Sequence, residues 1–186
     1  MGTDNGILIY NYRTDRYEQP ATDFPTDVRT MALQGDTLWI GALNGLYTYQ
    51  LQNRKLSPLD TKRNGLPHNT IYSIIRTGDN QIYVGTYNGL CRYIASNGKF
   101  EKIPLPVNSS QSNLFVNSLL EDTGRQCIWI GTEGYLFQYF PSTGQMKQTE
   151  AFHNNSIKSL ALDGNGDLLA GTDNGLYVYH NDVTPL

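Results

Sequence analysis

The sequence predicts an all-β protein built from β-propeller blades, because of an internal repeat, its strand pattern and its turns. One segment recurs as LWIGALNGLYTY at 38–49, IYVGTYNGLCRY at 82–93, IWIGTEGYLFQY at 128–139 and LLAGTDNGLYVY at 168–179, and a further copy, MGTDNGILIY, opens the chain. The glycines that the copies share, here called anchor glycines, are separated by 39, 44, 46 and 40 residues: Gly2, Gly41, Gly85, Gly131 and Gly171. A period of about 40 residues is typical of a four-stranded propeller blade.

A second shared segment precedes each complete copy and predicts the innermost strand of a blade. It reads VRTMAL from residue 28, IYSIIR from 71, VNSLLE from 116 and IKSLAL from 157. Aliphatic residues on both alternating faces indicate a strand that is buried on both sides. The third position is always small and hydroxylated, as a crowded strand near a central axis would require: Thr30, Ser73, Ser118 and Ser159.

Three more strands follow the innermost one in each repeat. The segment that ends at the anchor glycine is again apolar on both faces, and an Asn-Gly pair follows it in most copies. That pair predicts a tight hairpin in which both turn residues have positive φ. The third strand carries leucine on one face and aromatic residues on the other. A polar segment such as KFEKI at 99–103 then predicts a short outer strand, whose charges protect its unpaired backbone.

This pattern divides the chain into blades and favours a propeller over a β-solenoid, whose units are usually shorter. We expect a partial blade at 1–27, complete blades at 28–70, 71–115 and 116–156, and a blade without its outer strand at 157–186. Few propellers close with so few blades, so the chain is expected to be a fragment of a larger ring.

Composition excludes several classes of function. The net charge is -3 and the pI is near 5.5, which argues against nucleic-acid binding. No apolar run reaches the length of a membrane span, so we expect no membrane insertion of this segment, and no secretion signal is present. Cys91 and Cys127 lack metal-ligand spacing and are expected to be two separate thiols.

Residues 64–93, NGLPHNTIYSIIRTGDNQIYVGTYNGLCRY, resemble the two-component regulator propeller repeat. The shared features are GLP, an asparagine and two isoleucines, a polar turn with Asp and Gly, an aromatic residue before a GT pair, then GL and a tyrosine. All four full copies fit this pattern. The departures are a shifted glycine at Gly134-Tyr135, Leu169 in place of an aromatic residue, and a clear GLP element only at 65–67.

The resemblance implies a periplasmic sensor with two seven-bladed propellers, an Ig-like domain, a membrane span and a histidine kinase, often with a response regulator. Such receptors of Bacteroidetes sense oligosaccharides and switch on polysaccharide-utilisation genes. The implied function of this segment is therefore non-catalytic ligand sensing, and kinase activity is expected elsewhere in the receptor.

Motifs for catalysis, cofactors or metals are not expected. Asp163, Asn165 and Asp167 have the oxygen spacing that opens a calcium loop, but the loop then fails because Leu168 replaces the turning glycine, so we interpret it as a polar turn. Residues 122–124 are weakly similar to the Asp-box turn of sialidases and are also interpreted as structural. Of the histidines His68, His153 and His180, each falls in or beside a predicted loop.

The candidate ligand site is the loop face, defined by the loops between successive blades and the turns between second and third strands. Aromatic rings with amide and charged groups suit sugar rings, because they supply stacking and directional hydrogen bonds. The candidate residues are Arg63, His68, Asn69, Tyr87, Asn88, Glu133, Tyr135, His153, Asn154, Asp173 and Asn174.

Two other functions remain open: a propeller lyase or glycosidase, and a protein-interaction scaffold. The expected partners are an oligosaccharide ligand and a second copy of the chain, through open blade edges or in receptor dimerisation, with no nucleic acid.

Overall fold

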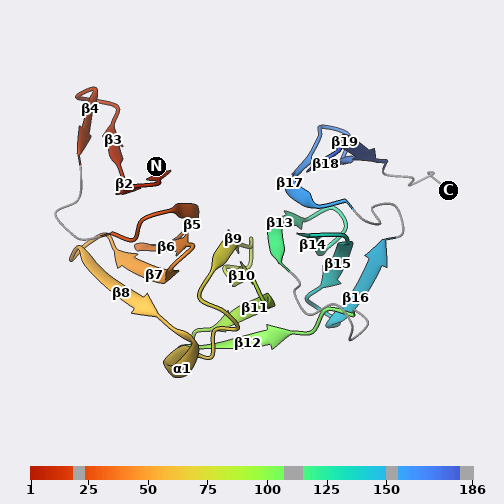
Figure 1. Cartoon of the computed structure of the whole chain (residues 1–186), viewed down its shortest axis with the longest axis horizontal. Helices are drawn as coiled ribbons and strands as arrows, with labels where there is room; N and C mark the ends of the chain where they lie inside the picture. The colour runs from red at the N-terminus through yellow and green to blue at the C-terminus, as the bar shows by residue number, and fades with distance from the viewer. Residues whose placement is uncertain (19–23, 107–114, 150–154, 181–186) are drawn as a thin grey trace. The chain divides into compact units, whose positions relative to one another are not determined.

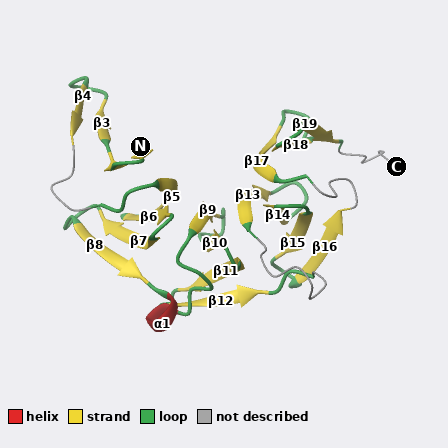
Figure 2. Cartoon of the chain, viewed as in Figure 1, coloured by secondary structure: helices red, strands yellow, loops and turns green. Residues whose placement is uncertain are grey.

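The computed structural model describes residues 1–18, 24–106, 115–149 and 155–180, and divides the chain into two compact units, Met1–Ile103 and Pro104–Leu186. Figure 1 labels the elements, and Figure 2 shows that strands and loops make up the described chain apart from one short helix. Each unit is built from antiparallel sheets whose strands lie in chain order. The predicted class of four-stranded propeller blades is confirmed.

The first unit contains two complete sheets after a short N-terminal portion. The N-terminal strands pair as two hairpins: β1 (Gly2–Thr3) with β2 (Gly6–Ile7), and β3 (Ile9–Asn11) with β4 (Arg16–Glu18). The first sheet has β5 (Val28–Gln34), β6 (Thr37–Ala42), β7 (Gly45–Gln50) and β8 (Lys55–Leu59). The second sheet has β9 (Ile71–Arg76), β10 (Ile82–Thr86), β11 (Gly89–Ile94) and β12 (Lys99–Ile103).

The second unit contains one four-stranded and one three-stranded sheet. The four-stranded sheet has β13 (Val116–Asp122), β14 (Cys127–Thr132), β15 (Leu136–Phe140) and β16 (Gln145–Thr149). The three-stranded sheet has β17 (Ile157–Leu162), β18 (Leu168–Thr172) and β19 (Gly175–Tyr179). The exact blade boundaries at 28–70, 71–115, 116–156 and 157–186 stay a prediction.

A short helix, α1 (Thr61–Asn64), connects β8 to the following loop. Asp60 caps its N-terminus, because its side chain accepts a hydrogen bond from the Arg63 amide at 2.7 Å. Gly65 ends it with φ of 73°, a left-handed conformation that favours glycine. The helix is too short for hydrophobic periodicity to have predicted it.

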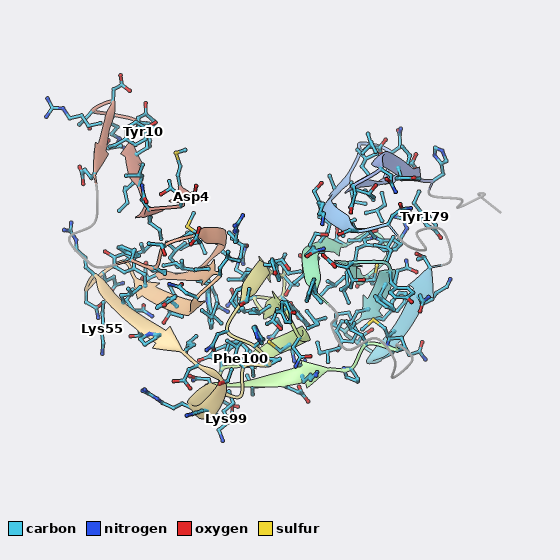
Figure 3. The ribbon with its side chains drawn as sticks, in the orientation of Figure 1. Asp4, Tyr10, Lys55, Lys99, Phe100 and Tyr179 are labelled. Carbon is cyan, nitrogen blue, oxygen red and sulfur yellow. The ribbon has the colours of Figure 1, made fainter. Side chains whose placement is uncertain are left out.

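The core lies between successive sheets, where aromatic and aliphatic side chains interdigitate. In the first unit, Trp39 of β6 packs edge-on against Tyr93 of β11 at 4.8 Å between ring centroids, and Phe100 of β12 joins them. Phe100 is labelled in Figure 3 and is only 7% exposed. In the second unit, Trp129 of β14 packs edge-on against Tyr179 of β19 at 5.8 Å. Each tryptophan therefore joins its own sheet to the next one.

Glycine is required at the anchor positions 41 and 131 because the next sheet packs directly against them. A Cβ added at Gly41 would lie 2.5 Å from Cγ2 of Ile71, the first residue of β9, and 2.6 Å from Cγ2 of Thr30. A Cβ at Gly131 would lie 2.6 Å from Cγ2 of Ile157, the first residue of β17. Real Cβ atoms essentially never come so close, so any larger residue would push the two sheets apart.

Thr30, at the hydroxylated third position of its inner strand, has a hydrogen-bonding role besides its small size. Every inner strand has an irregular register between its first and third residues, for example between Val28 and Thr30. In the first unit, the Ile74 amide of β9 donates to Oγ1 of Thr30 in β5 at 3.1 Å. The hydroxyl therefore satisfies a backbone donor of the neighbouring sheet, which the sequence pattern alone did not indicate.

The inner strands are less uniformly buried than predicted. β9 and β13 are mostly buried, but β5 and β17 are half exposed, and Leu33 of β5 is 52% exposed. The prediction of burial on both sides is wrong for β5 and β17. On one side β5 packs against the two-residue strand β1, and β17 contacts β13, β14 and β18.

The hairpins at the Asn-Gly pairs differ from the predicted turn. In the described residues Gly6, Gly89 and Gly175 have positive φ, of 109°, 95° and 112°, whereas the asparagines before them do not. The turn residues are the two before the glycine, since Thr86 pairs with Gly89. The Thr86 hydroxyl accepts from the Asn88 amide at 3.0 Å and donates to the Gly89 carbonyl at 2.9 Å. This hydroxyl bridge fixes the turn and leaves only the glycine in the positive-φ region.

Side-chain hydrogen bonds, here called a polar clamp, join successive sheets at the hairpins between first and second strands. In the first unit, Gln34 accepts from the Trp39 indole at 3.1 Å and donates to the Asn80 carbonyl at 2.7 Å. In the second unit, Asp122 accepts from the Trp129 indole at 3.0 Å. Asn80 lies in the hairpin between β9 and β10 and has a positive φ of 65°.

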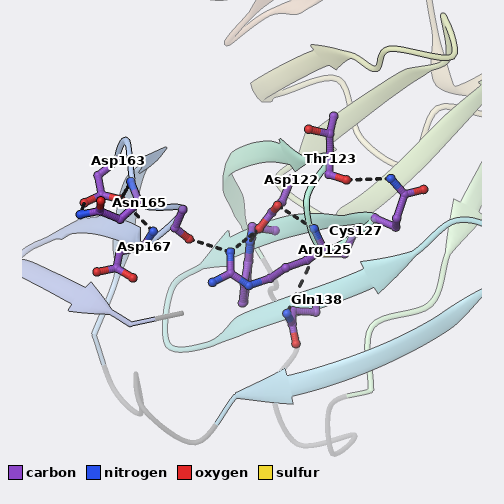
Figure 4. Close-up of polar contacts among 11 residues, drawn as sticks. Asp122, Thr123, Arg125, Cys127, Gln138, Asp163, Asn165 and Asp167 are labelled. Carbon is purple, nitrogen blue, oxygen red and sulfur yellow. Dashed lines mark hydrogen bonds and ion pairs between the residues drawn. The ribbon is translucent and has the colours of Figure 1, made fainter. Parts of the chain in front are cut away.

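Arg125 completes the second clamp. Its guanidinium pairs with Asp122 at 2.7 Å and donates to the Gly166 carbonyl of the β17–β18 hairpin at 2.8 Å (Figure 4). Gly166 and Asn80 occupy the same position, five residues before the anchor glycine of their sheets. The 122–124 segment therefore has a structural role, as interpreted from the sequence.

The ionised form of Asp122 is favoured in the folded protein. Burial by itself would raise the pKa of this carboxyl. Hydrogen bonds from the Trp129 indole, the Arg125 amide and the Arg125 guanidinium, together with the charge of Arg125, outweigh burial and lower its pKa.

Cys91 and Cys127 are buried free thiols. Burial raises the pKa of Cys91 far above its ordinary value, and burial together with the nearby Asp122 carboxylate raises the pKa of Cys127 to about 11. Both side chains are therefore held as neutral thiols near neutral pH.

Replacing an anchor glycine should destabilise the protein through overpacking. Gly131→Ala is expected to lower the free energy of unfolding by about 1–3 kcal/mol, measured by urea unfolding with tryptophan fluorescence. Gly134→Ala is the control, because an added Cβ there meets nothing within 4 Å. Equal effects of the two substitutions would contradict the proposed close packing.

The Asp122 clamp should give stability that depends on pH. Because its pKa is lower folded than unfolded, the ionised carboxyl stabilises the fold above its ordinary pKa of about 4, and this contribution is lost as pH falls through the folded pKa. Asp122→Asn should therefore be less stable than the wild type near about pH 6, and the difference should shrink near about pH 3. Urea midpoints at both pH values test this, and a constant difference would contradict it.

The buried thiols should be unreactive in the folded protein. We expect neither Cys91 nor Cys127 to react with a thiol reagent at neutral pH without denaturant, because both are inaccessible and protonated. Both should react in urea. Rapid labelling of either thiol under native conditions would show that its sheet opens readily.

Candidate functional site

Backbone hydrogen bonds build the loop face in both units. The Tyr87 amide donates to the Thr70 carbonyl at 3.0 Å, and the Leu43 amide donates to the Asp27 carbonyl at 3.3 Å. In the second unit, the Asp173 amide donates to the Ser156 carbonyl at 3.4 Å. Each bond joins the turn between second and third strands to the loop that leads into the inner strand of the same sheet. These two segments therefore lie side by side, as the sequence predicted.

In the first unit, two predicted residues form a stacked aromatic pair. The rings of His68 and Tyr87 lie 4.9 Å apart between centroids and are tilted by 32°. Nδ1 of His68 accepts a hydrogen bond from the Thr70 amide at 3.0 Å, so in this arrangement Nδ1 carries no proton and the ring orientation is fixed. Both rings are half-buried, which leaves part of their surface open to a ligand.

Thr70 also connects this pair to the preceding sheet. Its hydroxyl donates to the Leu43 carbonyl at 3.1 Å, while its own carbonyl accepts from the Tyr87 amide. The predicted residues Asn69 and Asn88 adjoin the aromatic pair in the chain and are exposed. The amide groups therefore flank a rigid aromatic surface.

Arg63 does not join the His68–Tyr87 pair. It lies on α1, where it is largely exposed and pairs with Asp60 at 3.2 Å. The helix packs beside the start of the outer strand β12, because Asn64 donates to the Gly98 carbonyl at 2.9 Å (Figure 1). The structure therefore places Arg63 at the outer edge of its sheet rather than beside the inner strand.

In the second unit, the predicted residues form amide and charge contacts. Asn174 donates to Oδ1 of Asn155 at 2.6 Å, and Glu133 faces Lys158 at 4.0 Å. Tyr135 stacks on Phe137 at 5.8 Å between ring centroids and is half-buried. Asp173 is exposed beside Asn174. His153 and Asn154 lie outside the described residues.

Sequence reasoning missed Asn117 and Lys158, which lie at the second position of an inner strand and contact the loop-face residues Ser156 and Glu133. The strand register skips the second residue of each inner strand, between the first and third residues. Such a β-bulge re-aims a side chain. The available signal was the contrast with the fixed first and third positions: the second is variable and polar or aromatic, as Arg29, Tyr72, Asn117 and Lys158.

The Asp163 carboxylate belongs to the polar turn between β17 and β18. Oδ1 of Asp163 accepts from the Asn165 and Asp167 amides, both at 2.8 Å, so this carboxylate organises its own turn. Residues 1–18, 24–106, 115–149 and 155–180 contain no group of three or more His, Cys, Asp or Glu side chains that could hold a metal. Within those ranges no helix has the length and apolar character needed to cross a membrane.

Residues 65–88 match the model of the two component regulator propeller family. These residues form a two-component regulator propeller repeat. No match was found among curated proteins.

A solved structure with high similarity is the extracellular domain of BT4673 from B. thetaiotaomicron, described both as a one component system and as a hybrid two component system. It is 90% identical, with a TM-score of 0.94 over 100% of this chain. The present chain spans 25% of the length of that protein. Recognition of the repeat family from residues 64–93 is therefore confirmed.

Two more distant structures share the fold alone. The extracellular domain of the hybrid two component system BT3049 from B. thetaiotaomicron is 19% identical, with a TM-score of 0.75 over 96% of this chain and 25% of that one. The computationally designed Ika4 protein is 15% identical, with a TM-score of 0.61 over 82% of this chain and 90% of that one. These likenesses show that the blade geometry does not depend on one sequence.

Proposed function

We propose that the chain is a non-catalytic, ligand-sensing segment of a periplasmic two-component receptor and recognises oligosaccharides on its loop face. In the complete receptor, binding would control genes for polysaccharide use. The high identity to an extracellular domain described as part of a hybrid two component system supports a sensory propeller segment. The chain covers a quarter of that protein, so kinase output and gene control belong to the proposal.

The observation that carries the proposal is the fixed His68–Tyr87 pair. Sugar rings have apolar faces that stack on aromatic rings and hydroxyl groups that need directional partners. The half-buried rings supply the first, and the exposed amides of Asn69 and Asn88 supply the second. Because the Thr70 amide fixes the His68 ring before any ligand arrives, little ordering entropy would be lost on binding.

Association of the chain with a second copy through open sheet edges stays a prediction. Leu176 of β19 is 68% exposed, whereas the equivalent Leu46, Leu90 and Leu136 are fully buried. Self-association is consistent with this exposed apolar side chain.

Loss of the aromatic pair should reduce oligosaccharide binding. We expect the chain to bind at least one member of a panel of cellotetraose, xylotetraose, mannotetraose and trigalacturonate, measured by isothermal titration calorimetry. Tyr87→Ala should lower that affinity by about tenfold, because it removes a stacking surface. Tyr17→Ala is the matched control, since Tyr17 is an exposed tyrosine on β4.

Two results would contradict the proposal. Binding of none of the probes would argue against oligosaccharide recognition by this segment. Equal losses in Tyr87→Ala and Tyr17→Ala would show that binding does not depend on the loop face.

A further inference from the structure

The contact between the two complete sheets of the first unit has two unlike sides. From the preceding sheet, Trp39 of β6 and Leu46 of β7 pack toward the following one. In the following sheet, Tyr93 of β11 and Phe100 of β12 receive the tryptophan, with ring centroids 4.8 and 6.5 Å away. All four side chains belong to one apolar cluster. A sheet therefore presents one surface to the sheet before it and a different surface to the sheet after it.

The three-stranded sheet exposes the surface that a preceding sheet presents. Leu169 of β18 pairs with Val178 of β19, and Gly171 pairs with Leu176, so these side chains share one face. The other face of the same sheet packs on the cluster around Trp129. Leu176 and Val178 are 68% and 46% exposed. Leu169, Leu176 and Val178 are here called the C-terminal face.

The N-terminal hairpin exposes the surface that a following sheet presents. Tyr10 of β3 pairs with Tyr17 of β4, as Tyr93 pairs with Phe100. The ring centroids lie 5.0 Å apart in the first pair and 5.3 Å apart in the second. Tyr10, labelled in Figure 3, is 44% exposed and Tyr17 is 62% exposed, whereas Phe100 is buried. The two tyrosines are here called the N-terminal face.

The repeat identifies which residues of the two faces correspond to the internal contact. Leu169 lies two residues before its anchor glycine, where the first complete sheet has Trp39. Tyr10 lies eight residues after its anchor glycine, as Tyr93 does. Packing the C-terminal face of one copy on the N-terminal face of another would therefore repeat the arrangement within the chain, with Leu169 directed at Tyr10 and its paired tyrosine.

We propose that the chain associates head to tail, with the C-terminal face of one copy packed on the N-terminal face of a second copy. Terminal units of a repeat array normally carry a polar outer surface, which neither face has. Burial of these apolar and aromatic side chains supplies the driving force. Because the two faces differ, the contact is heterologous rather than symmetric. This inference goes beyond ligand recognition and does not depend on it.

The contact between copies should be weaker than the contacts between sheets of one chain. Within the chain, Ile71 and Ile157 at the starts of inner strands pack closely on Gly41 and Gly131. The described strands β1–β4 include no inner strand, so the second copy brings no such residue to the anchor glycine of the C-terminal face. The small apolar area predicts a transient association, visible at protein concentrations of about 0.1 mM.

Sedimentation velocity of the intact chain over a concentration series tests the association. The average mass of the wild type should rise above 20.9 kDa as concentration increases. Leu176→Asp and Tyr17→Asp should each remain monomeric, because each would bury an unpaired charge in the contact. Leu51→Asp is the matched control and should associate like the wild type, since Leu51 is an exposed leucine in the turn between β7 and β8.

Mixing the two deficient variants tests the head-to-tail geometry. Leu176→Asp keeps an intact N-terminal face, and Tyr17→Asp keeps an intact C-terminal face. An equimolar mixture should therefore form a 1:1 dimer although neither variant associates alone. Recovery of the dimer also shows that both variants are folded. A symmetric contact between two C-terminal faces would instead leave Tyr17→Asp dimeric and the mixture without a new species, which would overturn the proposal.

The remaining outcomes separate this inference from the proposed function. A wild type that stays monomeric throughout the series, or association that persists in Leu176→Asp, overturns the head-to-tail contact. Tyr87→Ala should associate like the wild type, and Tyr17→Asp should keep its oligosaccharide affinity in calorimetry. Retained binding with no association therefore leaves the proposed function standing, and association without binding of any oligosaccharide leaves the head-to-tail contact standing.

Discussion

The close contact between an anchor glycine and the first inner-strand residue of the next sheet is the constraint on which the remaining structure depends. Ile71 fills the space at Gly41, and Ile157 fills it at Gly131. The two sheets can approach this closely because glycine has no Cβ to separate them. Once this distance is set, the tryptophans of the second strands β6 and β14 meet aromatic residues of the following sheet, as Trp39 meets Tyr93 and Trp129 meets Tyr179. Apolar burial between sheets then supplies most of the stability.

At the hairpins between first and second strands, different polar side chains bind the tryptophan indole and a backbone carbonyl of the next sheet. A single Gln34 binds both its own tryptophan and the next sheet, whereas the equivalent position in the second unit divides these roles between Asp122 and Arg125. The acceptor is the carbonyl at the same repeat position in both cases. The position of the carbonyl is set by the backbone, so the side chains that reach it can differ. The charged version introduces a pH dependence that the glutamine version lacks.

The same separation of fixed backbone and free side chain applies to the loop face. The hydroxyls of Thr70 and Thr86 fix the turns and loops by binding backbone groups of Leu43, Asn88 and Gly89. Recognition can therefore vary from blade to blade while the sheets stay unchanged. Repeat proteins commonly use this arrangement, because each unit contacts only its neighbours.

The sequence by itself determined the repeat, the four-stranded units and the positions of the turns. These follow from local chemistry: runs of apolar residues in the strands, a small residue on each crowded inner strand, and Asn-Gly pairs at the tight turns. It also placed His68 and Tyr87 on one face, because both lie in segments that the strand order brings together.

Only the tertiary structure decided which of the candidate residues meet. It separated Arg63 from the aromatic pair by placing it on α1 beside β12, and it brought Lys158 to Glu133 and Asn174 to Asn155. It also gave positive φ to the glycine but not the asparagine at the Asn5-Gly6, Asn88-Gly89 and Asn174-Gly175 turns, and it revealed the bulge at the second inner-strand residue. Those features depend on contacts between residues far apart in the chain, and a local pattern holds no information about which distant groups will pair.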